Sequence, residues 1–360
     1  MKIIQIIPQL SSGGAERFVV DLSNELSHRH KVLLIVSYAL IGEISFYLPE
    51  VSENVKVESL HKKRGFDISY IYRLYKIIKR ELPDVVHTHI SAFGHFALLK
   101  LLFPKVKFVH TIHSDAKAEA GGIIRFNLKK MFFKKNMCRA VTISATSNMS
   151  FRNLYGGKTP ATLIPNGRSV QTPMIHEDPS LIPQNEEGYN FVSIGHISQV
   201  KNHLLLCSAI TELTRKGTPI ELYIFGRIVD YNIYESIKAL ANPHIHLLGE
   251  ISNPHQYLLN ADVFCMSSVR EGMPISLIEA LSCGLIPICT AVGGIVDMVK
   301  DGKTGFLVQD MTIESYVNAI ERFLSLTEVE RKEMKQLCLE SARQYSIEEC
   351  AKKYEDLFMK

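Results

Sequence analysis

Two glutamates placed eight positions apart, Glu271 and Glu279, are the first chemically suggestive feature of the sequence. Glu271 follows an apolar run that ends at Met266, and Pro274 suits the first turn of a helix. Glu279 would then lie about one and a half turns inside that helix. Carboxylates accept hydrogen bonds from sugar hydroxyls, and the free N–H groups of a first helical turn bind phosphate. Taken alone, such a pair more often consists of solvated surface side chains.

A glycine-rich loop is the second feature. Gly13 and Gly14 follow the first apolar run and precede a helical pattern that begins near Ala15. Adjacent glycines let backbone N–H groups approach an anion, and a helix N-terminus adds its positive dipole. A tight turn between a strand and a helix would use glycines as well. Because the loop lacks the Gly-x-Gly-x-x-Gly fingerprint and no acidic residue ends the second apolar run, a dehydrogenase is disfavoured.

His87 and His89 end another apolar run, where a pair of metal ligands is one interpretation. No third ligand lies within reach in the sequence, so we expect histidines of the wall or core of a sheet. The motif Asp-x-Asp, the usual carboxylate seat for a diphosphate-bound divalent ion, does not occur in the chain. The sequence therefore predicts neither a metal site nor a cofactor.

The elements that must position these residues follow from the alternation of short apolar runs with amphipathic stretches. Strands of the first half are expected over residues 2–8, 31–38, 55–60, 84–89, 107–113, 140–145 and 162–165, with helices at 15–27, 68–80 and 92–102. Strands of the second half are expected over residues 190–195, 220–225, 245–248, 262–266 and 285–289, with a helix at 203–215. This pattern predicts an α/β protein of two doubly wound parallel-sheet, Rossmann-like domains.

The expected domain boundaries follow composition and periodicity. The first domain spans residues 1–167, and the second spans 189–344. Between them, residues 168–188 lack periodicity and contain three prolines, which is typical of a linker. A final amphipathic helix within 345–360 either packs on the second domain or packs back on the first.

Charge is distributed unevenly between the two halves. Residues 1–166 hold 24 Lys and Arg against 12 Asp and Glu, whereas residues 167–360 hold 17 against 25. A basic first half predicts an anionic partner. Segment 122–139 has six basic and no acidic residues, with large apolar residues between them. It favours either an anionic membrane surface or a helix whose apolar side is buried while its lysines stay in water.

Several classes of protein and location are excluded or favoured by composition. No nucleic-acid module signature accompanies the basic charge, so no nucleic-acid partner is expected. The N-terminus lacks a signal-peptide arrangement, and no stretch reaches the roughly 18 apolar residues of a spanning helix. The seven cysteines never form Cys-x-x-Cys and mostly lie in apolar runs, which favours reduced thiols. We therefore expect a cytoplasmic protein, or a peripheral one on the inner face of the membrane.

The most specific sequence signal is the order of several motifs along almost the whole chain. In order they are GGAE (13–16), DVVHTH (84–89), HTIH (110–113), IPNG (164–167), GHI (195–197), KNH (201–203), REGMP (270–274), EALSCG (279–284), VGGI (292–295) and DGKTGFLV (301–308). This ordered set resembles glycosyltransferase family 4, whose members are retaining, metal-independent enzymes of GT-B architecture. The resemblance implies two domains that face each other across a cleft.

The resemblance also implies a reaction. A sugar would pass from a nucleotide-diphosphate sugar, with UDP the expected nucleotide, to a hydroxyl of a glycan or lipid-linked glycan acceptor. Such enzymes act in the biosynthesis of cell-surface polysaccharide or lipopolysaccharide. Two alternatives stay open from the sequence: a nucleotide-sugar epimerase of the same architecture, and a nucleotide-sugar-binding protein without activity.

Matching positions receive roles from the same resemblance. Gly13 and Gly14 would donate backbone N–H groups to the donor diphosphate, and Lys201 would pair with that diphosphate. His113 would face the donor sugar, and Glu271 would lie near it. Catalysis would thus rest on Glu271, His113 and Lys201.

The segment after Glu271 would surround the rest of the donor. Backbone N–H groups of Met273, Ile275 and Ser276 would lie around sugar and phosphate, whereas Pro274 in the same turn has no N–H to give. Glu279 would accept hydrogen bonds from the ribose hydroxyls.

One position departs from the family pattern. Members usually carry arginine directly after the glycine that ends the first strand of the second domain, and here that position is His196. A neutral imidazole offers one donor where a guanidinium offers five, so the diphosphate charge is less well neutralised. Either Arg227, which follows the next strand, supplies the missing cation, or His196 itself becomes charged beside a diphosphate.

Overall fold

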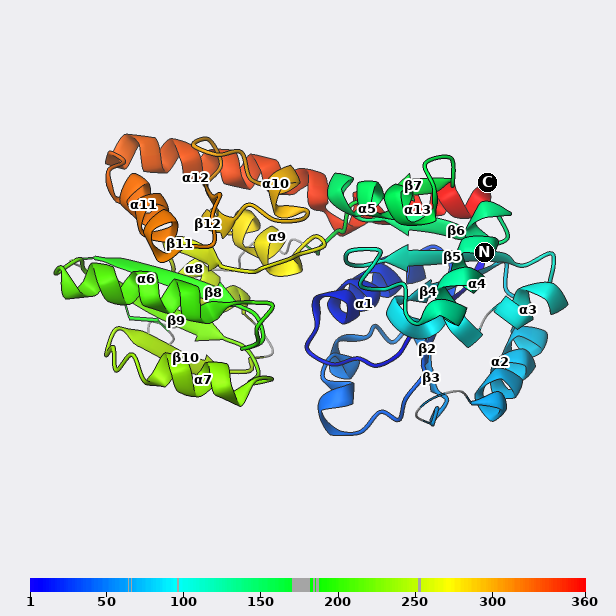
Figure 1. Cartoon of the computed structure of the whole chain (residues 1–360). Helices are drawn as coiled ribbons and strands as arrows, with labels where there is room; N and C mark the ends of the chain where they lie inside the picture. The colour runs from blue at the N-terminus through cyan, green and yellow to red at the C-terminus, as the bar shows by residue number, and fades with distance from the viewer. Residues whose placement is uncertain are drawn as a thin grey trace. The chain divides into compact units, whose positions relative to one another are not determined.

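The computed structural model describes residues 1–63, 65, 67–95, 97–169, 182–183, 185, 188–251 and 254–360. These residues divide into two compact units, Met1–Ser169 with Tyr345–Lys360 and Val170–Gln344 (Figure 1). Arg168 and Ser169 of the expected linker thus lie in the first unit, which we call unit 1. Residues 170–181, 184, 186 and 187 of the expected linker lie outside the described residues.

Unit 1 is built on a parallel sheet of seven strands within the described residues, in the order β3-β2-β1-β4-β5-β6-β7. The strands are β1 (Lys2–Ile7), β2 (Lys31–Val36), β3 (Val55–Ser59), β4 (Val85–His89), β5 (Lys107–Ile112), β6 (Arg139–Thr142) and β7 (Ala161–Leu163). The helices between them are α1 (Gly14–Ser27), α2 (Ile68–Glu81), α3 (Ala97–Leu102), α4 (Ile123–Lys134) and α5 (Ala145–Tyr155). The strand order reverses at β1 and β4, which is where ligands bind in such sheets.

Unit 2 repeats this architecture with six strands among its described residues, in the order β10-β9-β8-β11-β12-β13. The strands are β8 (Tyr189–Ile194), β9 (Ile220–Phe225), β10 (Ile245–Gly249), β11 (Val263–Met266), β12 (Ile286–Thr290) and β13 (Phe306–Val308). The helices are α6 (His203–Arg215), α7 (Tyr231–Lys238), α8 (His255–Leu259), α9 (Ile275–Ser282), α10 (Ile295–Met298), α11 (Ile313–Leu324) and α12 (Glu328–Ala342). The prediction of two doubly wound parallel-sheet domains is confirmed.

Local signals explain where individual helices begin and end. Asp67 caps α2 by accepting a hydrogen bond from the backbone N–H of Tyr70 at 3.0 Å, and the helix ends where Leu82 adopts a left-handed conformation. The helix expected over 92–102 is instead a 3-10 turn, Ile90–His95, followed by the short α3. Among the described helices, none has the length and hydropathy that a bilayer crossing requires.

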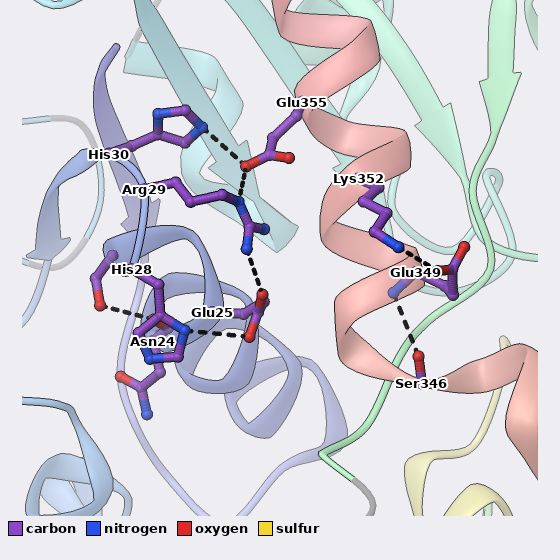
Figure 2. Close-up of polar contacts among 10 residues, drawn as sticks. Asn24, Glu25, His28, Arg29, His30, Ser346, Glu349, Lys352 and Glu355 are labelled. Atoms are coloured by element: carbon purple, nitrogen blue, oxygen red, sulfur yellow. Dashed lines mark hydrogen bonds and ion pairs between the residues drawn. The ribbon is translucent and has the colours of Figure 1, made fainter.

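The last helix, α13 (Ile347–Met359), belongs to unit 1 although the chain reaches it after unit 2. Its buried side includes Tyr354, whose ring centroid lies 6.1 Å from that of Phe18 on α1. Glu355 accepts a hydrogen bond from Nε of Arg29 at 2.9 Å and pairs with Nε2 of His30 at 2.8 Å (Figure 2). An apolar face and an ion-pair cluster therefore join α13 to the end of α1.

Both ends of α13 are fixed to unit 1 as well. At its start, the backbone N–H of Ile347 donates to the carbonyl of Arg168 at 3.1 Å. At its end, Arg139 donates to the carbonyl of Leu357 at 2.8 Å, and Lys107 donates to the carbonyl of Phe358 at 2.8 Å. These cations satisfy carbonyl groups that a helix terminus leaves without intrahelical partners.

Replacing Tyr354 tests how strongly α13 contributes to unit 1. Tyr354→Ala should lower the free energy of unfolding by about 3–5 kcal/mol, the usual cost of deleting a buried aromatic ring. Tyr354→Phe should cost about 1 kcal/mol, because it removes only the hydrogen bond with Thr111. Urea unfolding measures both, with the exposed Lys353→Ala as the control. If α13 were not packed on unit 1, all three variants would have the same free energy of unfolding.

Candidate functional site

In unit 2, the loop that carries Glu271 is held by a neighbouring glycine pair. Gly293 has a φ of +55°, and a Cβ there would clash with the carbonyl oxygen of Glu271. The next residue, Gly294, donates its N–H to the carbonyl of Gly272 at 2.8 Å. Only glycine permits this approach at position 293, so the motif at 292–295 fixes the backbone next to Glu271.

Lys201 and Glu271, expected at the same donor, form an ion pair in the structure. Nζ of Lys201 donates to Oε1 of Glu271 at 2.6 Å, and Oγ of Ser268 donates to the same oxygen at 2.7 Å. The side chains are 25% and 10% exposed, so the pair is shielded from water more than an ordinary surface pair. The aliphatic part of Lys201 lies against Gly195, where a Cβ would come within 3.3 Å.

Two serines that the sequence did not single out support this ion pair. Ser268 contacts Glu271 directly, and Oγ of Ser267 donates to the carbonyl oxygens of Lys201 at 3.0 Å and Asn202 at 2.9 Å. Both serines are buried at the carboxyl end of β11. The sequence feature that could have identified both serines is their position between a buried strand and the Glu271 motif.

The segment after Glu271 enters α9, as expected. Pro274 is its N-cap, and no side chain caps this N-terminus. Ser276 approaches β8, with Oγ donating to the carbonyl of Ile194 at 3.4 Å. Met273 and Ile275 are buried, and Glu279 is 7% exposed in the helix interior. A carboxylate so deeply covered is not an ordinary solvated glutamate, which disfavours the surface interpretation.

His196 and Arg227 occupy corresponding positions on neighbouring segments. β8 and β9 pair in parallel, and the bridge between Ile197 and Ile228 continues their register beyond the strands. Ile197 also donates its N–H to the carbonyl of Arg227 at 2.9 Å. The structure thus places the backbone of Arg227 beside that of His196, the position at which the resemblance implies arginine.

In unit 1, Gly13 is the N-cap of α1 and makes no side-chain cap. A Cβ at Gly13 would clash with Oε2 of Glu16, a buried residue that also accepts a hydrogen bond from Oγ of Ser11 at 3.3 Å. Gly14 is exposed. A larger residue at position 13 would therefore displace the carboxylate of Glu16, and the contact of Gly13 with an anion stays a prediction.

His113 follows β5 and ends a chain of buried polar groups. Its Nε2 lies 2.9 Å from Nδ1 of His89, and Nε2 of His89 lies 2.9 Å from Oε1 of Gln5. Because an amide oxygen only accepts, His89 donates through Nε2 and accepts through Nδ1. Neutral His113 must then donate through Nε2, which leaves its Nδ1 as an acceptor. Gln5 and His89 thus set the tautomer of the histidine expected to face the sugar.

A second polar chain connects the same strands to α13. Nε2 of His87 lies 2.7 Å from Oγ1 of Thr111, which in turn lies 2.8 Å from the hydroxyl of Tyr354. His87 and His89 are fully covered, as expected for histidines of the sheet core. Within the described ranges, no group of three or more His, Cys, Asp or Glu side chains is arranged to hold a metal ion.

Burial keeps these histidines neutral. It lowers the pKa of His113 to about 3 and lowers the pKa values of His87, His89 and His110 well below the usual value. In unit 2, burial and the nearby charge of Lys201 lower the pKa of His203 to about 3. At neutral pH, His113 therefore acts as a hydrogen-bonding group rather than a cation.

Comparison with known proteins assigns both halves of the chain. Residues 12–171 match the family described as Glycosyltransferase Family 4, and residues 176–340 match Glycosyl transferases group 1. The Escherichia coli UDP-Gal:alpha-D-GlcNAc-diphosphoundecaprenol alpha-1,3-galactosyltransferase is 26% identical over 296 residues, which are 77% of this chain and 74% of that protein.

Two further proteins extend the comparison. The Campylobacter jejuni GalNAc-alpha-(1->4)-GalNAc-alpha-(1->3)-diNAcBac-PP-undecaprenol alpha-1,4-N-acetyl-D-galactosaminyltransferase is 27% identical over 322 residues, 86% of this chain and 84% of that one. Among solved structures, Anabaena HepE in complex with UDP and glucose superposes with a TM-score of 0.84 at 16% identity, over 100% of this chain and 99% of that one. At this identity the likeness concerns the fold.

The buried histidines predict a loss of stability in mild acid. Below pH 6.5 they bind protons in the unfolded chain but not in the folded one, so the free energy of unfolding falls as pH falls. Each such histidine contributes a slope of about 1.4 kcal/mol per pH unit. Urea unfolding between pH 7 and pH 5 measures this slope. His110→Phe removes one buried histidine and should reduce the slope by about 1.4 kcal/mol per pH unit. A free energy of unfolding that does not change with pH would contradict the conclusion that these histidines are buried and neutral.

Proposed function

Because the chain belongs to glycosyltransferase family 4, whose members are retaining enzymes of GT-B fold, we propose that it transfers a sugar from a UDP-sugar to a hydroxyl of a lipid-linked glycan. Family membership favours transfer over the epimerase and over the binding protein without activity. The observation that carries the proposal is the ion pair of Lys201 and Glu271 beside the start of α9.

The names of the relatives support the donor and acceptor classes. The Escherichia coli relative is named for UDP-Gal, and the Anabaena structure contains UDP and glucose. Both bacterial relatives are named for acceptors on undecaprenol diphosphate. We infer a UDP-sugar donor and an acceptor glycan on a lipid diphosphate, in the biosynthesis of a cell-surface polysaccharide or lipopolysaccharide.

Unit 2 offers groups suited to each part of the donor. The buried carboxylate of Glu279 is assigned to the ribose hydroxyls. His196 and Arg227 are assigned to the diphosphate, and their corresponding positions let Arg227 supply charge that a neutral imidazole lacks. The backbone around Met273, Ile275 and Ser276, with Pro274 as the N-cap of α9, is assigned to sugar and phosphate.

The chemistry proposed for this site depends on stabilising the leaving group. The acceptor hydroxyl attacks the anomeric carbon on the face from which the diphosphate departs, and a phosphate oxygen takes the hydroxyl proton. Lys201 stabilises the charge that develops on the diphosphate. Glu271 already holds the ammonium of Lys201 at 2.6 Å, so the cation needs little reorganisation when charge develops.

The roles of the unit 1 residues rest on family membership. Gly13 and Gly14 are assigned to the diphosphate, and His113 is assigned to the donor sugar. Nδ1 of His113 is an acceptor in the tautomer set by His89 and Gln5, so it suits a sugar hydroxyl that donates.

Most of the basic segment 122–139 forms α4, which has one side inside unit 1. Phe132 and Phe133 are buried there. Lys129 does not stay in water: it is 4% exposed, and its Nζ donates to the carbonyl of Glu119 at 2.7 Å. Lys129 is therefore a structural residue, and the charge available to a partner is smaller than the sequence alone indicates.

The other side of α4 is suited to an anionic membrane surface. Ile123 and Ile124 are 77% and 81% exposed, and Lys134 and Lys135 are exposed on the same helix or directly after it. We propose peripheral binding to the cytoplasmic face of the membrane, where a lipid-linked acceptor is presented. Burial of six of the seven free cysteines supports a reducing compartment.

Glu279→Ala tests the donor site. The variant should bind UDP with about 1.5–3 kcal/mol less free energy, because it loses a charge-assisted hydrogen bond to ribose. Titration calorimetry with UDP measures this loss, and the exposed Glu333→Ala of α12 is the matched control. Unchanged UDP affinity would remove Glu279 from the site.

A thermal-shift panel of UDP-, GDP- and ADP-sugars compares the three bases in the wild type. A larger shift of the melting temperature with GDP- or ADP-sugars would overturn the uridine assignment.

Sedimentation with anionic vesicles tests the membrane proposal. Binding should fall steeply with salt, since each exposed basic residue contributes about 1 kcal/mol and the attraction decays over about 10 Å at 0.1 M salt. Lys134→Gln with Lys135→Gln should weaken sedimentation strongly, as should Ile123→Ser with Ile124→Ser. Lys352→Gln with Lys353→Gln on α13 is the control of equal charge. If all three double variants sediment like the wild type, α4 does not face the membrane.

A further inference from the structure

Unit 1 contains a cavity of about 80 Å³ that the donor assignments do not use. It lies at the carboxyl edge of the sheet: Pro8 follows β1, Ser37 and Tyr38 follow β2, and Ser91 comes shortly after β4. Ligands of open parallel sheets bind at this edge, near the point where the strand order reverses. The volume holds several water molecules, and so accommodates a phosphate group.

The charged side chains that line this cavity are cations. They are Lys62 and Arg125, and no carboxylate lines it among the described residues. Nζ of Lys62 donates to the carbonyls of Lys63 at 2.9 Å and Gly65 at 2.7 Å, which leaves the ammonium a third donor. Within the part of the chain that the structure describes, no hydrogen bond or ion pair engages the guanidinium of Arg125.

Lys62 and Arg125 lie close enough for the charge of one to affect the other. Burial lowers the pKa of Lys62, Asp67 opposes that shift, and the charge of Arg125 lowers the pKa further. Asp67 itself is occupied at the start of α2, where it accepts from the backbone of Tyr70 and pairs with Arg73 at 3.4 Å. An anion in the cavity would relieve the repulsion between Lys62 and Arg125.

Hydroxyl groups complete the lining. The buried hydroxyl of Tyr70 lies 2.7 Å from Oγ of Ser37. Burial raises the pKa of Tyr70 to about 12, so this hydroxyl keeps its proton at neutral pH. Tyr38 and Ser91 add two further hydroxyls. Hydroxyl donors beside two cations are the groups that bind phosphate oxygens.

Backbone strain occurs in two of the segments that line the cavity. Ile90, directly before Ser91, has a φ of +54°, and His61, directly before Lys62, has a φ of +46°. A β-branched residue rarely adopts the left-handed conformation, so Ile90 is a true outlier. Strain of this kind persists where the surrounding structure enforces it, often at binding sites.

We propose that this cavity binds a phosphate of the diphosphate that links the acceptor glycan to its lipid, with Lys62 and Arg125 as the cations and Ser37, Tyr38 and Ser91 as hydroxyl donors. The inference rests on the proposed function, because it names the acceptor group that unit 1 holds. It also gives the basic charge of the first half a defined anionic partner.

Titration calorimetry with inorganic pyrophosphate tests the cavity, using the full chain saturated with UDP so that the donor site is occupied. Lys62→Gln and Arg125→Gln should each weaken pyrophosphate binding at least tenfold, and the double variant should abolish it. Lys117→Gln, an exposed lysine of the same unit, should stay within twofold of the wild type. UDP affinity should also stay within twofold in the cavity variants, which shows that they fold.

The outcomes separate the inference from the proposed function. Equal pyrophosphate affinity in the wild type and both cavity variants, with UDP binding intact, overturns the cavity and leaves the proposed function standing. Failure of the wild type to bind UDP overturns the donor assignment instead, and pyrophosphate binding sensitive to both cations would still support an anion site.

A second ligand distinguishes a lipid-linked diphosphate from a free one. Geranyl diphosphate carries the same anion on a short prenyl chain. If the wild type binds it and both cavity variants lose that binding at least tenfold, the lipid-linked acceptor is supported. If only pyrophosphate binds, the cavity takes free anions, and the acceptor assignment is wrong.

Discussion

Every paired strand in both sheets runs parallel to its neighbours, so each loop that follows a strand starts from the same edge of its sheet. This constraint brings together residues that are far apart along the chain. Lys201 and Glu271 are 70 positions apart, yet they share a hydrogen bond because β8 and β11 are neighbours. Gln5 and His89, which lie within β1 and β4, meet because these two strands are paired. The candidate residues of each unit are therefore grouped by topology before any side chain is considered.

The sequence predicts the elements well because burial on both faces gives strands a simple signature. The expected β9 and α6 coincide with the observed ones, and Lys201 and Glu271, which the resemblance assigns to one donor, form an ion pair. Pairings between strands are harder, because periodicity shows which face a residue occupies but not which residue it meets. The tautomer of His113 depends on such pairings with His89 and Gln5, so it becomes visible only in the structure.

The role of each charged residue is likewise only partly predictable from the sequence. Counting Lys and Arg identifies a basic first half, but the count treats every cation alike. The structure separates three kinds: Lys129 is buried and bonded to a carbonyl, Arg139 and Lys107 bind the end of α13, and Arg125 faces a cavity. His196 gains its neighbour Arg227 from the register of β8 and β9. Composition predicts an anionic partner, whereas position decides which cations are free to meet it.

The place of α13 in unit 1 also affects how the protein is made. Unit 1 needs residues 345–360, which leave the ribosome after all of unit 2 has been synthesised. Until then, the side of α1 that carries Phe18 and the hydroxyl of Thr111 lack their contacts with Tyr354 of α13. Unit 2 is contiguous in sequence, so all of its elements are synthesised before α13 is. Unit 1 therefore begins first and is completed last. During that interval, the surface left uncovered for a chaperone to bind lies on unit 1, which was synthesised first.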